Sequence, residues 1–366
     1  MKQDKIILIY HKQMDRYDGN AAYVRKLIES LRVNYEVVLP SELFYRAKIR
    51  ISKKWFIRTL QVNVFMILYF LKHKVRSDPN VKYVVMEDRY SLFAALYFLG
   101  SRAKLVSRVS DWGIEYVQSF PFHMKITKSI FYDFELVYEL FVTKFSDAII
   151  VPSEYLLGLL SKKNNFPVLV YPYSLNVPPQ EECSLNLKIK RNMDFIVNCV
   201  FIGNYEYAPN REGAQFIIDS LSTEIYREDV NIKFIIAGPG AKERLNIINR
   251  ENIEILGPVN NLDELYNRCV IGLNPTETVG GTSIKTIEYL IHGLFVISTP
   301  QSSKGVIETP RLLKTDRDHF KDEILKLARV IRSGENINDP REIERIRNYY
   351  SFSSNKEKLL NFFGNL

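Results

Sequence analysis

The sequence predicts an α/β protein made of two doubly wound units, each built on a parallel sheet. At 366 residues the chain exceeds the size at which one hydrophobic core usually keeps growing. Short apolar runs alternate with helical patterns over residues 5–173 and again over residues 195–299. Between the two series, residues 171–194 interrupt the pattern with prolines and a cluster of charges, which indicates a domain boundary near residue 180.

Short runs rich in β-branched residues predict the strands of the first unit, at residues 5–10, 35–40, 82–87, 103–109, 147–152 and 167–173. Helical periodicity fills the intervals near residues 20–32, 59–73, 90–99, 124–145 and 153–162. Because a helical crossover between two strands of one sheet makes those strands parallel, we expect a parallel sheet.

The second half repeats the scheme, with strands at residues 195–203, 232–238, 253–257, 270–275 and 294–299 and helices near 210–222, 241–249, 262–268 and 283–292. After residue 317 only helical sequence remains, and Pro340 suits a helix start. We therefore expect an N-terminal Rossmann-like domain at residues 1–176, a linker at 177–194, a C-terminal Rossmann-like domain at 195–340, and a helical segment at 341–366. In one arrangement, the helical segment at 341–366 packs back on the first domain.

The composition is that of a folded protein in a reducing compartment. Hydrophobic residues make up 46% of the chain and charged residues 25%, which argues against disorder. Cys183, Cys199 and Cys269 have no metal-ligand spacing and cannot all pair. The first apolar run is too short for a signal peptide, and the run at residues 64–71 is too short to span a bilayer. We expect a cytoplasmic protein, for which a peripheral position on the inner face of the cell membrane is one option.

All of the excess basic charge lies in the first half. Residues 1–176 hold 26 Lys and Arg against 16 Asp and Glu, whereas residues 177–366 hold 24 against 26. Residues 44–76 contain aromatic residues and no acidic one, and nine basic residues: Arg46, Lys48, Arg50, Lys53, Lys54, Arg58, Lys72, Lys74 and Arg76. Such a segment can bind an anionic membrane surface, or it can be a solvated helix face. Nucleic acid is not expected as a partner, because no nucleic-acid-binding module accompanies the segment.

Small and polar residues follow four strands of the second half. In parallel sheets ligands bind at the carboxyl ends of strands, so these residues are candidates for one site, although a glycine after a strand is usually only a turn. The candidates are Gly203, Asn204, Gly238, Gly257, Pro258, Val259, Gly280, Gly281, Thr282 and Ser283.

The stretch TETVGGTSIKTIEYLIHG, at residues 276–293, is an amide-rich loop that enters a helix. Helix N-termini bind anions through unpaired N–H groups and the helix dipole. Lys285 and Glu288 lie three residues apart and share a helix face. Either they form a solvated surface ion pair, or Lys285 meets a phosphate and Glu288 accepts hydrogen bonds from a diol such as ribose. The second interpretation predicts a nucleotide diphosphate as ligand.

Four segments at residues 201–217, 234–240, 251–276 and 280–300, among them FIIAGPG and GGTSIKTIEYLIHGLFVISTP, resemble the donor-binding domain of family-4-type glycosyltransferases of GT-B fold, the glycosyl transferases group 1. The first half is similar more weakly, through YDGNAAYVRKLIESL and SDAIIVPSEYL. The resemblance implies two Rossmann-like domains facing a cleft. It also implies that Glu288 holds the ribose and that the loop at Gly257, Pro258 and Val259 receives the base.

The sequence departs from the family at two places. A second glutamate is common eight residues before the ribose glutamate, and Gly280 stands there. An arginine and a lysine are common after the first strand of this domain, and here Asn204 is followed by Asn210 and Arg211. Lys285, as a catalytic cation, and Arg211 are the candidates to replace the lost charge.

On the acceptor side, Asp111 follows a strand together with Trp112 and Glu115. Asp111 falls where the family often has a residue facing the donor sugar, which makes it the second catalytic candidate, but an N-cap aspartate beside a core tryptophan explains the same residues. Gly19 and Asn20 either open the first helix toward the cleft or are a plain helix start. The histidines show no ligand spacing and no DxD-like pair occurs, so no metal and no other cofactor is expected.

The sequence thus predicts an enzyme that transfers a sugar from a nucleotide diphosphate to a glycan or lipid-linked acceptor in cell-surface polysaccharide or glycoconjugate synthesis. The resemblance implies retention at the anomeric carbon without a metal. Two alternatives stay open at this point: a sugar-nucleotide epimerase of the same fold, and a non-catalytic scaffold that binds nucleotide sugar.

Overall fold

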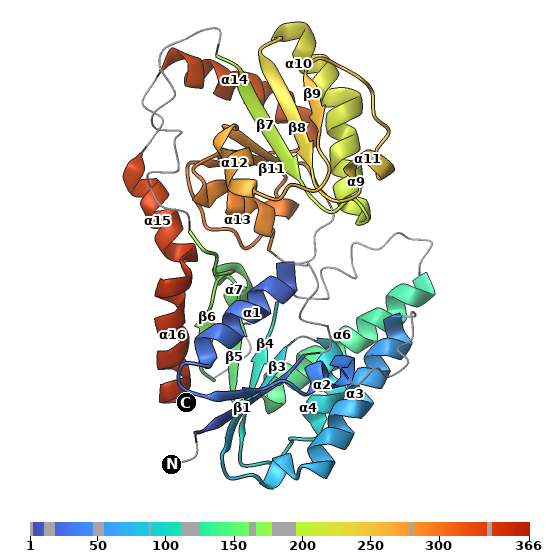
Figure 1. The fold of residues 1–366 in the computed structure, drawn as a ribbon, viewed down its shortest axis with the longest axis vertical. Coiled ribbons are helices and arrows are strands. Elements are labelled where there is room, and N and C mark those ends of the chain that lie inside the picture. Colours follow the sequence, from blue (N-terminus) through green and yellow to red (C-terminus); the bar gives the residue numbers. More distant parts are fainter. Residues whose placement is uncertain are drawn as a thin grey trace. The chain divides into compact units, whose positions relative to one another are not determined.

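The computed structural model describes residues 3–10, 19–46, 55–87, 89–110, 125–160, 166–177, 195–277, 282–334 and 339–366. The chain forms two compact units, of which the first contains residues 1–174 and 352–366 and the second contains residues 175–351. Within the described residues each unit has one six-stranded sheet, and all neighbouring strands run parallel (Figure 1). The prediction of two doubly wound α/β units is therefore confirmed.

The first sheet has the strand order β2-β1-β3-β4-β5-β6. Its strands are β1 (Lys5–Ile9), β2 (Glu36–Val38), β3 (Val81–Glu87), β4 (Lys104–Arg108), β5 (Ala148–Val151) and β6 (Val168–Val170). Each lies at a run from which a strand was predicted. Consecutive residues of β1 and β5 are buried, as expected for strands of a parallel sheet that helices cover on both faces.

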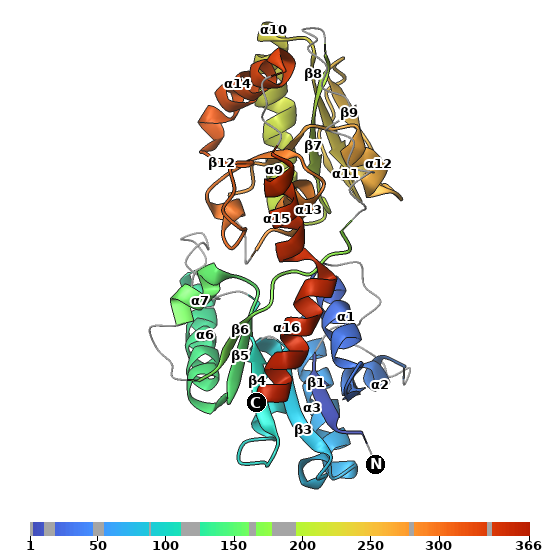
Figure 2. The same cartoon turned by 90° about the vertical axis from the view of Figure 1, so that its left-hand side faces the viewer.

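Helices cover both faces of this sheet. Figure 2 shows α1 (Gly19–Leu31) and α16 (Phe352–Asn365) in front of the strands. The opposite face carries α3 (Trp55–Lys72), α4 (Leu92–Leu96) and α6 (Lys125–Phe145), which share one core with α7 (Glu154–Leu160) and the strands. The shorter elements are α2 (Pro40–Arg46), which the sequence analysis did not predict, and the 3-10 turns η1 (Val75–Ser77) and η2 (Arg89–Ser91).

The second sheet has the order β12-β11-β10-β7-β8-β9. Its strands are β7 (Val197–Ile202), β8 (Ile232–Ala237), β9 (Ile253–Ile255), β10 (Ile271–Asn274), β11 (Phe295–Ser298) and β12 (Leu312–Lys314). Five were predicted. The sixth, β12, was missed because only two consecutive apolar residues, Leu312 and Leu313, mark it in the sequence.

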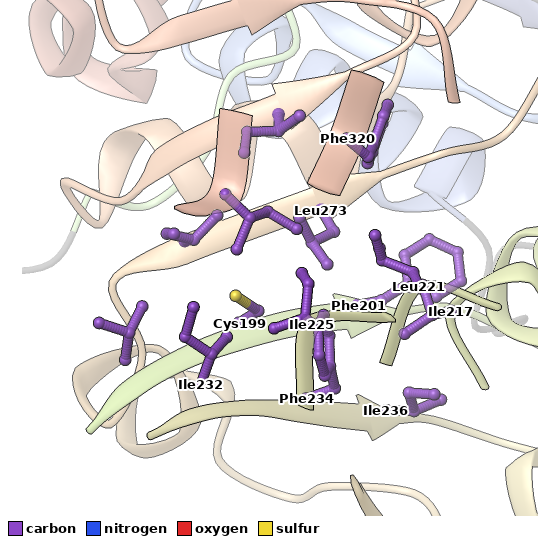
Figure 3. Close-up of a cluster of buried hydrophobic side chains, with 14 of the residues drawn as sticks. Cys199, Phe201, Ile217, Leu221, Ile225, Ile232, Phe234, Ile236, Leu273 and Phe320 are labelled. Carbon is purple, nitrogen blue, oxygen red and sulfur yellow. The ribbon is translucent and has the colours of Figure 1, made fainter. Parts of the chain in front are cut away.

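The helices of the second unit are α9 (Ala208–Phe216), α10 (Ser222–Glu228), α11 (Ala241–Arg244), α12 (Leu262–Asn267), α13 (Ile284–Ile291), α14 (Phe320–Ser333) and α15 (Pro340–Tyr350). The π-helical turn η5 (Ile217–Leu221) joins α9 to α10, and 3-10 turns occur at η6 (Gln301–Ser303) and η7 (Arg317–His319). Figure 3 shows part of the core of the second unit, a single cluster of buried residues that includes Phe201, Phe234, Ile217 and Leu221.

The predicted C-terminal segment 341–366 is divided between the units. Helix α15 belongs to the second unit, where Tyr350 accepts a hydrogen bond through its carbonyl from the N–H of Leu175 at 2.9 Å. Helix α16 belongs to the first unit, where it contacts α1, and the carbonyl of Phe363 accepts a hydrogen bond from the hydroxyl of Tyr83 at 2.5 Å. Of the predicted linker 177–194, residues 178–194 lie outside the described residues.

Candidate functional site

The carboxyl ends of β7, β8 and β9 are joined by hydrogen bonds between their loops. The N–H of Gly203 donates to Ala237 at 3.1 Å, and the N–H of Gly238 donates to the carbonyl of Gly257 at 3.0 Å. Gly238 has a φ of +130°, and a Cβ there would lie 2.0 Å from the carbonyl oxygen of Gly203. Only glycine fits at that position. The structure therefore brings Gly203, Gly238 and Gly257 together along one edge of the sheet.

Asn204 and Arg211 stabilise the loop that follows β7. The side-chain oxygen of Asn204 accepts from the N–H of Glu206 at 2.9 Å. The guanidinium of Arg211 donates to the carbonyls of Tyr205 and Glu206, at 2.9 and 2.7 Å. Both side chains thus hold the loop, and the Arg211 guanidinium is engaged by its backbone carbonyls.

A buried polar cluster fixes the start of α13 to the end of β10. The amide of Asn274 donates to the hydroxyls of Ser283 and Thr286, each at 2.9 Å. The carbonyl oxygen of the Asn274 side chain accepts from Thr276 at 2.8 Å. Thr282 and Ser283 are buried in this cluster, whereas Gly280 and Gly281 lie outside the described residues.

Helix α13 begins without a side-chain cap. Ser283 is the N-cap residue, but its hydroxyl bonds to Asn274 and Thr286 and makes no capping bond to the backbone. The N–H groups of the first helical turn, which have no partner within a helix, therefore receive no bond from this residue. A helix start of this kind can bind an anion.

The Lys285 ammonium lies on the buried side of α13. Its Nζ donates to the side-chain oxygen of Asn210 at 2.6 Å and stands 4.3 Å from the centroid of the Phe201 ring. Burial lowers the pKa of Lys285 to about 7, although the carboxylate of Glu288 opposes that shift. The Lys285 ammonium therefore loses its proton more readily than that of an exposed lysine.

Glu288 has a partner that the sequence analysis missed. Its Oε2 accepts a hydrogen bond from the hydroxyl of Tyr266 at 3.0 Å. Burial raises the pKa of Glu288, while the bond from Tyr266 and the charge of Lys285 lower it. Lys285 and Glu288 are both half-buried and take different partners, so the exposed surface pair considered above does not describe them.

His292 connects α13 to α12. One ring nitrogen is 2.7 Å from the carbonyl oxygen of Glu288, and the other is 2.8 Å from the Asp263 carboxylate. The ring also packs against Tyr266, with centroids 4.4 Å apart. No local pattern could have predicted the contact between Tyr266 and His292, because the two residues are 26 positions apart in the sequence and meet only through the fold.

The remaining predicted side chains divide into three groups. Pro258 is exposed and Val259 is half-buried in the loop after β9. Gly19 and Asn20 begin α1, and their side chains lie outside what the structure describes. Asp111, Trp112 and Glu115 lie wholly outside the described residues.

A buried ion pair occupies the carboxyl ends of β3 and β4 in the first unit. The Arg108 guanidinium pairs with Glu87, and both side chains are fully buried. The same guanidinium stacks on the ring of Tyr23 of α1 at 3.9 Å. Tyr23 in turn donates to the carbonyl of Tyr171 at 2.5 Å. These contacts tie the start of α1 to the sheet end from which Asp111 continues.

Among the residues that the structure describes, no three His, Cys, Asp or Glu side chains gather closely enough to hold a metal ion. The described helices also include none with the length and apolar character needed to cross a bilayer. The absence of a metal requirement stays a prediction.

Residues 197–329, which lie within the second unit, match the family described as glycosyl transferases group 1. A curated relative from Klebsiella pneumoniae is 22% identical over 299 residues, which is 74% of this chain and 70% of that protein. It is described as an uncharacterized 44.6 kDa protein in the cps region.

Solved structures are similar along the whole chain. Sucrose-phosphate synthase from Thermosynechococcus elongatus superposes with a TM-score of 0.68 at 13% identity, covering 100% of this chain and 99% of that one. HepE from Anabaena, solved with UDP, gives 0.64 at 11% identity and covers all of both chains. TarM gives 0.58 at 14% identity, covering 82% of this chain and 58% of that one. These likenesses show the GT-B fold.

Proposed function

We propose that the chain is a glycosyltransferase that moves a sugar from a nucleotide diphosphate to a glycan or lipid-linked acceptor, since residues 197–329 match the glycosyl transferases group 1. The observation that carries the proposal is the convergence of three features on α13: an uncapped start, the Lys285 ammonium and the Glu288 carboxylate. They lie at the carboxyl edge of a parallel sheet, where ligands of such sheets bind.

In the proposed complex each feature meets a different part of the donor. The diphosphate lies at the start of α13, where backbone N–H groups and Lys285 offset its charge. Glu288, oriented by Tyr266, accepts hydrogen bonds from the ribose hydroxyls. The base lies against Gly257, Pro258 and Val259, and Gly257 leaves open space on that side because nothing is found within 4 Å of a Cβ built there.

The reaction forms one bond and breaks one. An acceptor hydroxyl bonds to the anomeric carbon, and the bond from that carbon to the phosphate oxygen breaks with its electron pair leaving on the nucleoside diphosphate. The acceptor proton is lost to the departing phosphate or to solvent. Amides and a cation already in place at the diphosphate stabilise the leaving group without rearranging. We propose retention at the anomeric carbon, no metal requirement, and Asp111 as the residue facing the donor sugar.

The biological setting is part of the proposal. The relative encoded in a cps region supports a role in polysaccharide synthesis, and HepE, solved with UDP and with UDP-glucose, supports a uridine nucleotide among the donors to test first. Free, buried thiols at Cys199 and Cys269 support a reducing, cytoplasmic compartment. The basic first half supports work at an anionic membrane surface.

A panel of nucleotide sugars, scored for release of nucleoside diphosphate, tests the proposal. We expect release from one donor, and at least tenfold less from Lys285→Met. The matched control is Lys242→Met, which removes an exposed lysine on α11 and should leave the rate unchanged. Conversion of the donor sugar into its epimer without release of diphosphate would show an epimerase. Tight nucleotide binding without any turnover across the panel would favour a scaffold.

A further inference from the structure

Helix α3 is apolar on two opposite sides. One side carries Val62, Met66 and Phe70, which are fully buried in the core of the first unit. The other side carries five large apolar residues that are 44% to 59% exposed: Ile57, Leu60, Val64, Leu68 and Leu71. They recur every three or four positions, so they form one continuous stripe along the helix. In this article the stripe is called the outer face of α3.

Other helices of the protein expose charged residues at the equivalent positions. The exposed side of α1 carries Arg25 and Glu29, and the exposed Arg32 directly follows its last residue. The exposed side of α14 carries Asp322, Lys326 and Arg329. An ordinary solvated helix has this pattern, with apolar residues inside and charged residues outside. The outer face of α3 therefore cannot be explained as a plain solvated surface.

The apolar surface continues onto the neighbouring helix α4. Phe93 and Leu96 are exposed there. Helix α4 contacts α3, and Phe98, two residues after α4 ends, has its ring centroid 4.9 Å from that of Phe70. Helix α6 exposes Val137 and Leu140. Because α3, α4 and α6 share a single core against one face of the sheet, their outer sides belong to the same layer (Figure 1). An apolar area of this extent usually marks an interaction surface.

Basic residues accompany the outer face at both ends. Lys72 and Lys74 are exposed where α3 ends, and the exposed Arg46 precedes it at the end of α2. Lys48, Arg50, Lys53 and Lys54 belong to the intervening sequence, which lies outside the described residues. No acidic residue occurs in residues 44–76. The acidic residues on the helices packed with α3 are Glu42 of α2, which pairs with Arg46, the exposed Asp133 of α6, and the buried Glu135 and Glu139 of α6.

We propose that the outer face of α3, together with Phe93 and Leu96, docks the first unit on an anionic lipid bilayer. The stripe from Ile57 to Leu71 is roughly 21 Å long at 1.5 Å per residue, so the helix would lie in the plane of the interface with its apolar side in the acyl region and its basic ends at the headgroups. This surface specifies how the first unit would reach the membrane named in the proposed function, and the inference rests on that proposed function.

Charge favours a bilayer over a second copy of the chain. In a two-fold contact the same patch meets itself, so the basic ends of one α3 would face basic residues of the other. Residues 44–76 offer no carboxylate to compensate. An anionic bilayer complements both the apolar stripe and the charge, since each Lys or Arg near such a surface is attracted to it.

Vesicle co-sedimentation of the full chain tests the surface. We expect the protein to bind mixed phosphatidylglycerol and phosphatidylcholine vesicles at low salt, and to bind less at high salt and on pure phosphatidylcholine. The double variant Leu60→Glu, Leu68→Glu should bind at least tenfold more weakly. The matched control, Val230→Glu with Ile247→Glu, changes two similarly exposed residues of the second unit and should bind like the parent.

Three results would overturn the inference: equal binding to neutral and anionic vesicles, undiminished binding by the α3 double variant, or a parent dimer in sedimentation equilibrium that this variant makes monomeric. Such a dimer would assign the outer face of α3 to a second copy of the chain. Thermal unfolding confirms that each variant is folded. Release of nucleoside diphosphate in the absence of vesicles separates the two proposals. The rate of release should be equal in the parent and the α3 variant. If neither protein releases nucleoside diphosphate, that result counts only against the proposed reaction.

Discussion

At the scale of single residues, Glu288 illustrates which part of the site the sequence could predict. Its spacing from Lys285 and its place after a glycine-rich loop indicated a role at a helix start. The sequence could not show that Tyr266 donates to its carboxylate, because Tyr266 lies on another helix, α12. Local periodicity contains no information about partners that only tertiary packing brings together.

We expect Glu288→Gln to weaken nucleotide binding by about 1.5 to 3 kcal/mol, the typical strength of hydrogen bonds to a charged group. Tyr266→Phe, which leaves the carboxylate but removes its orienting bond, should cost less. Calorimetric titration with nucleoside diphosphate measures both. Glu224→Gln, on the exposed side of α10, is the control for loss of a carboxylate. Unaltered affinity in a folded Glu288→Gln protein would refute the ribose assignment.

We also expect donor affinity to depend on pH through Lys285. Its pKa in the free protein is about 7, and a bound diphosphate favours the protonated form, so the bound pKa is higher. Above pH 7 binding must therefore take up a proton, and affinity should fall by up to about tenfold per pH unit. Affinity should also fall at acid pH, as Glu288 becomes protonated. Because burial raises the pKa of Glu288, this loss should begin at a higher pH than it would for an exposed glutamate.

Calorimetry in two buffers of different ionisation enthalpy would detect that proton uptake directly. Lys285→Met should abolish the dependence on the alkaline side and keep the one on the acid side. A parent protein whose affinity is flat between pH 7 and pH 9 would show that the ammonium does not meet the phosphates.

At the scale of elements, strands were predicted better than short helices and turns. Eleven strands coincide with apolar runs, since strands of parallel sheets are buried on both faces and appear in sequence as continuous apolar segments. Helix α2 was missed because it directly follows the apolar run from which β2 was predicted, and β12 because only two consecutive apolar residues mark it. The expected single helix at 210–222 extends to Glu228 through the π-helical turn η5, a local change of hydrogen bonding that residue type does not signal.

The loops after β7 and β8 give a test at this scale. We expect Gly238→Ala to destabilise the second unit by at least about 3 kcal/mol, because it forces a strained φ and a collision with the Gly203 carbonyl. Gly257→Ala is the matched variant. Nothing lies within 4 Å of its Cβ, so stability should change by less than about 1 kcal/mol while nucleotide affinity falls. Denaturant unfolding and calorimetry measure the two effects, and equal stability of the two variants would contradict this account.

At the scale of the whole molecule, the first unit is completed by the end of the chain. Helix α16 covers α1 and packs Phe363 against Tyr83, with ring centroids 5.0 Å apart. The sequence indicated helices after residue 317, but which unit each of them joins depends on contacts made across nearly the full length of the chain. Assignment of α15 and α16 to different units is therefore a result that only the structure provides.

Removal of residues 352–366 should destabilise the first unit and spare the second. Both tryptophans, Trp55 and Trp112, belong to the first unit, so their fluorescence follows its unfolding alone. We expect the fluorescence transition of the truncated chain to shift to lower temperature by several degrees, while calorimetric nucleotide binding by the second unit is retained. A fluorescence transition identical to that of the full chain would mean that α16 contributes nothing to the first unit.

The same connectivity has a consequence for biosynthesis. A ribosome delivers residues 352–366 only after the whole of residues 175–351, so the second unit has all of its residues available before the first unit has its last helix. Domains generally fold as units as they emerge during synthesis, and here that order is reversed, with the later unit closing first. Until residues 352–366 are made, Phe363 is missing from the face that carries Tyr35 and Tyr83. A released chain that stops at residue 351 would therefore carry every residue of the second unit and an incomplete first unit.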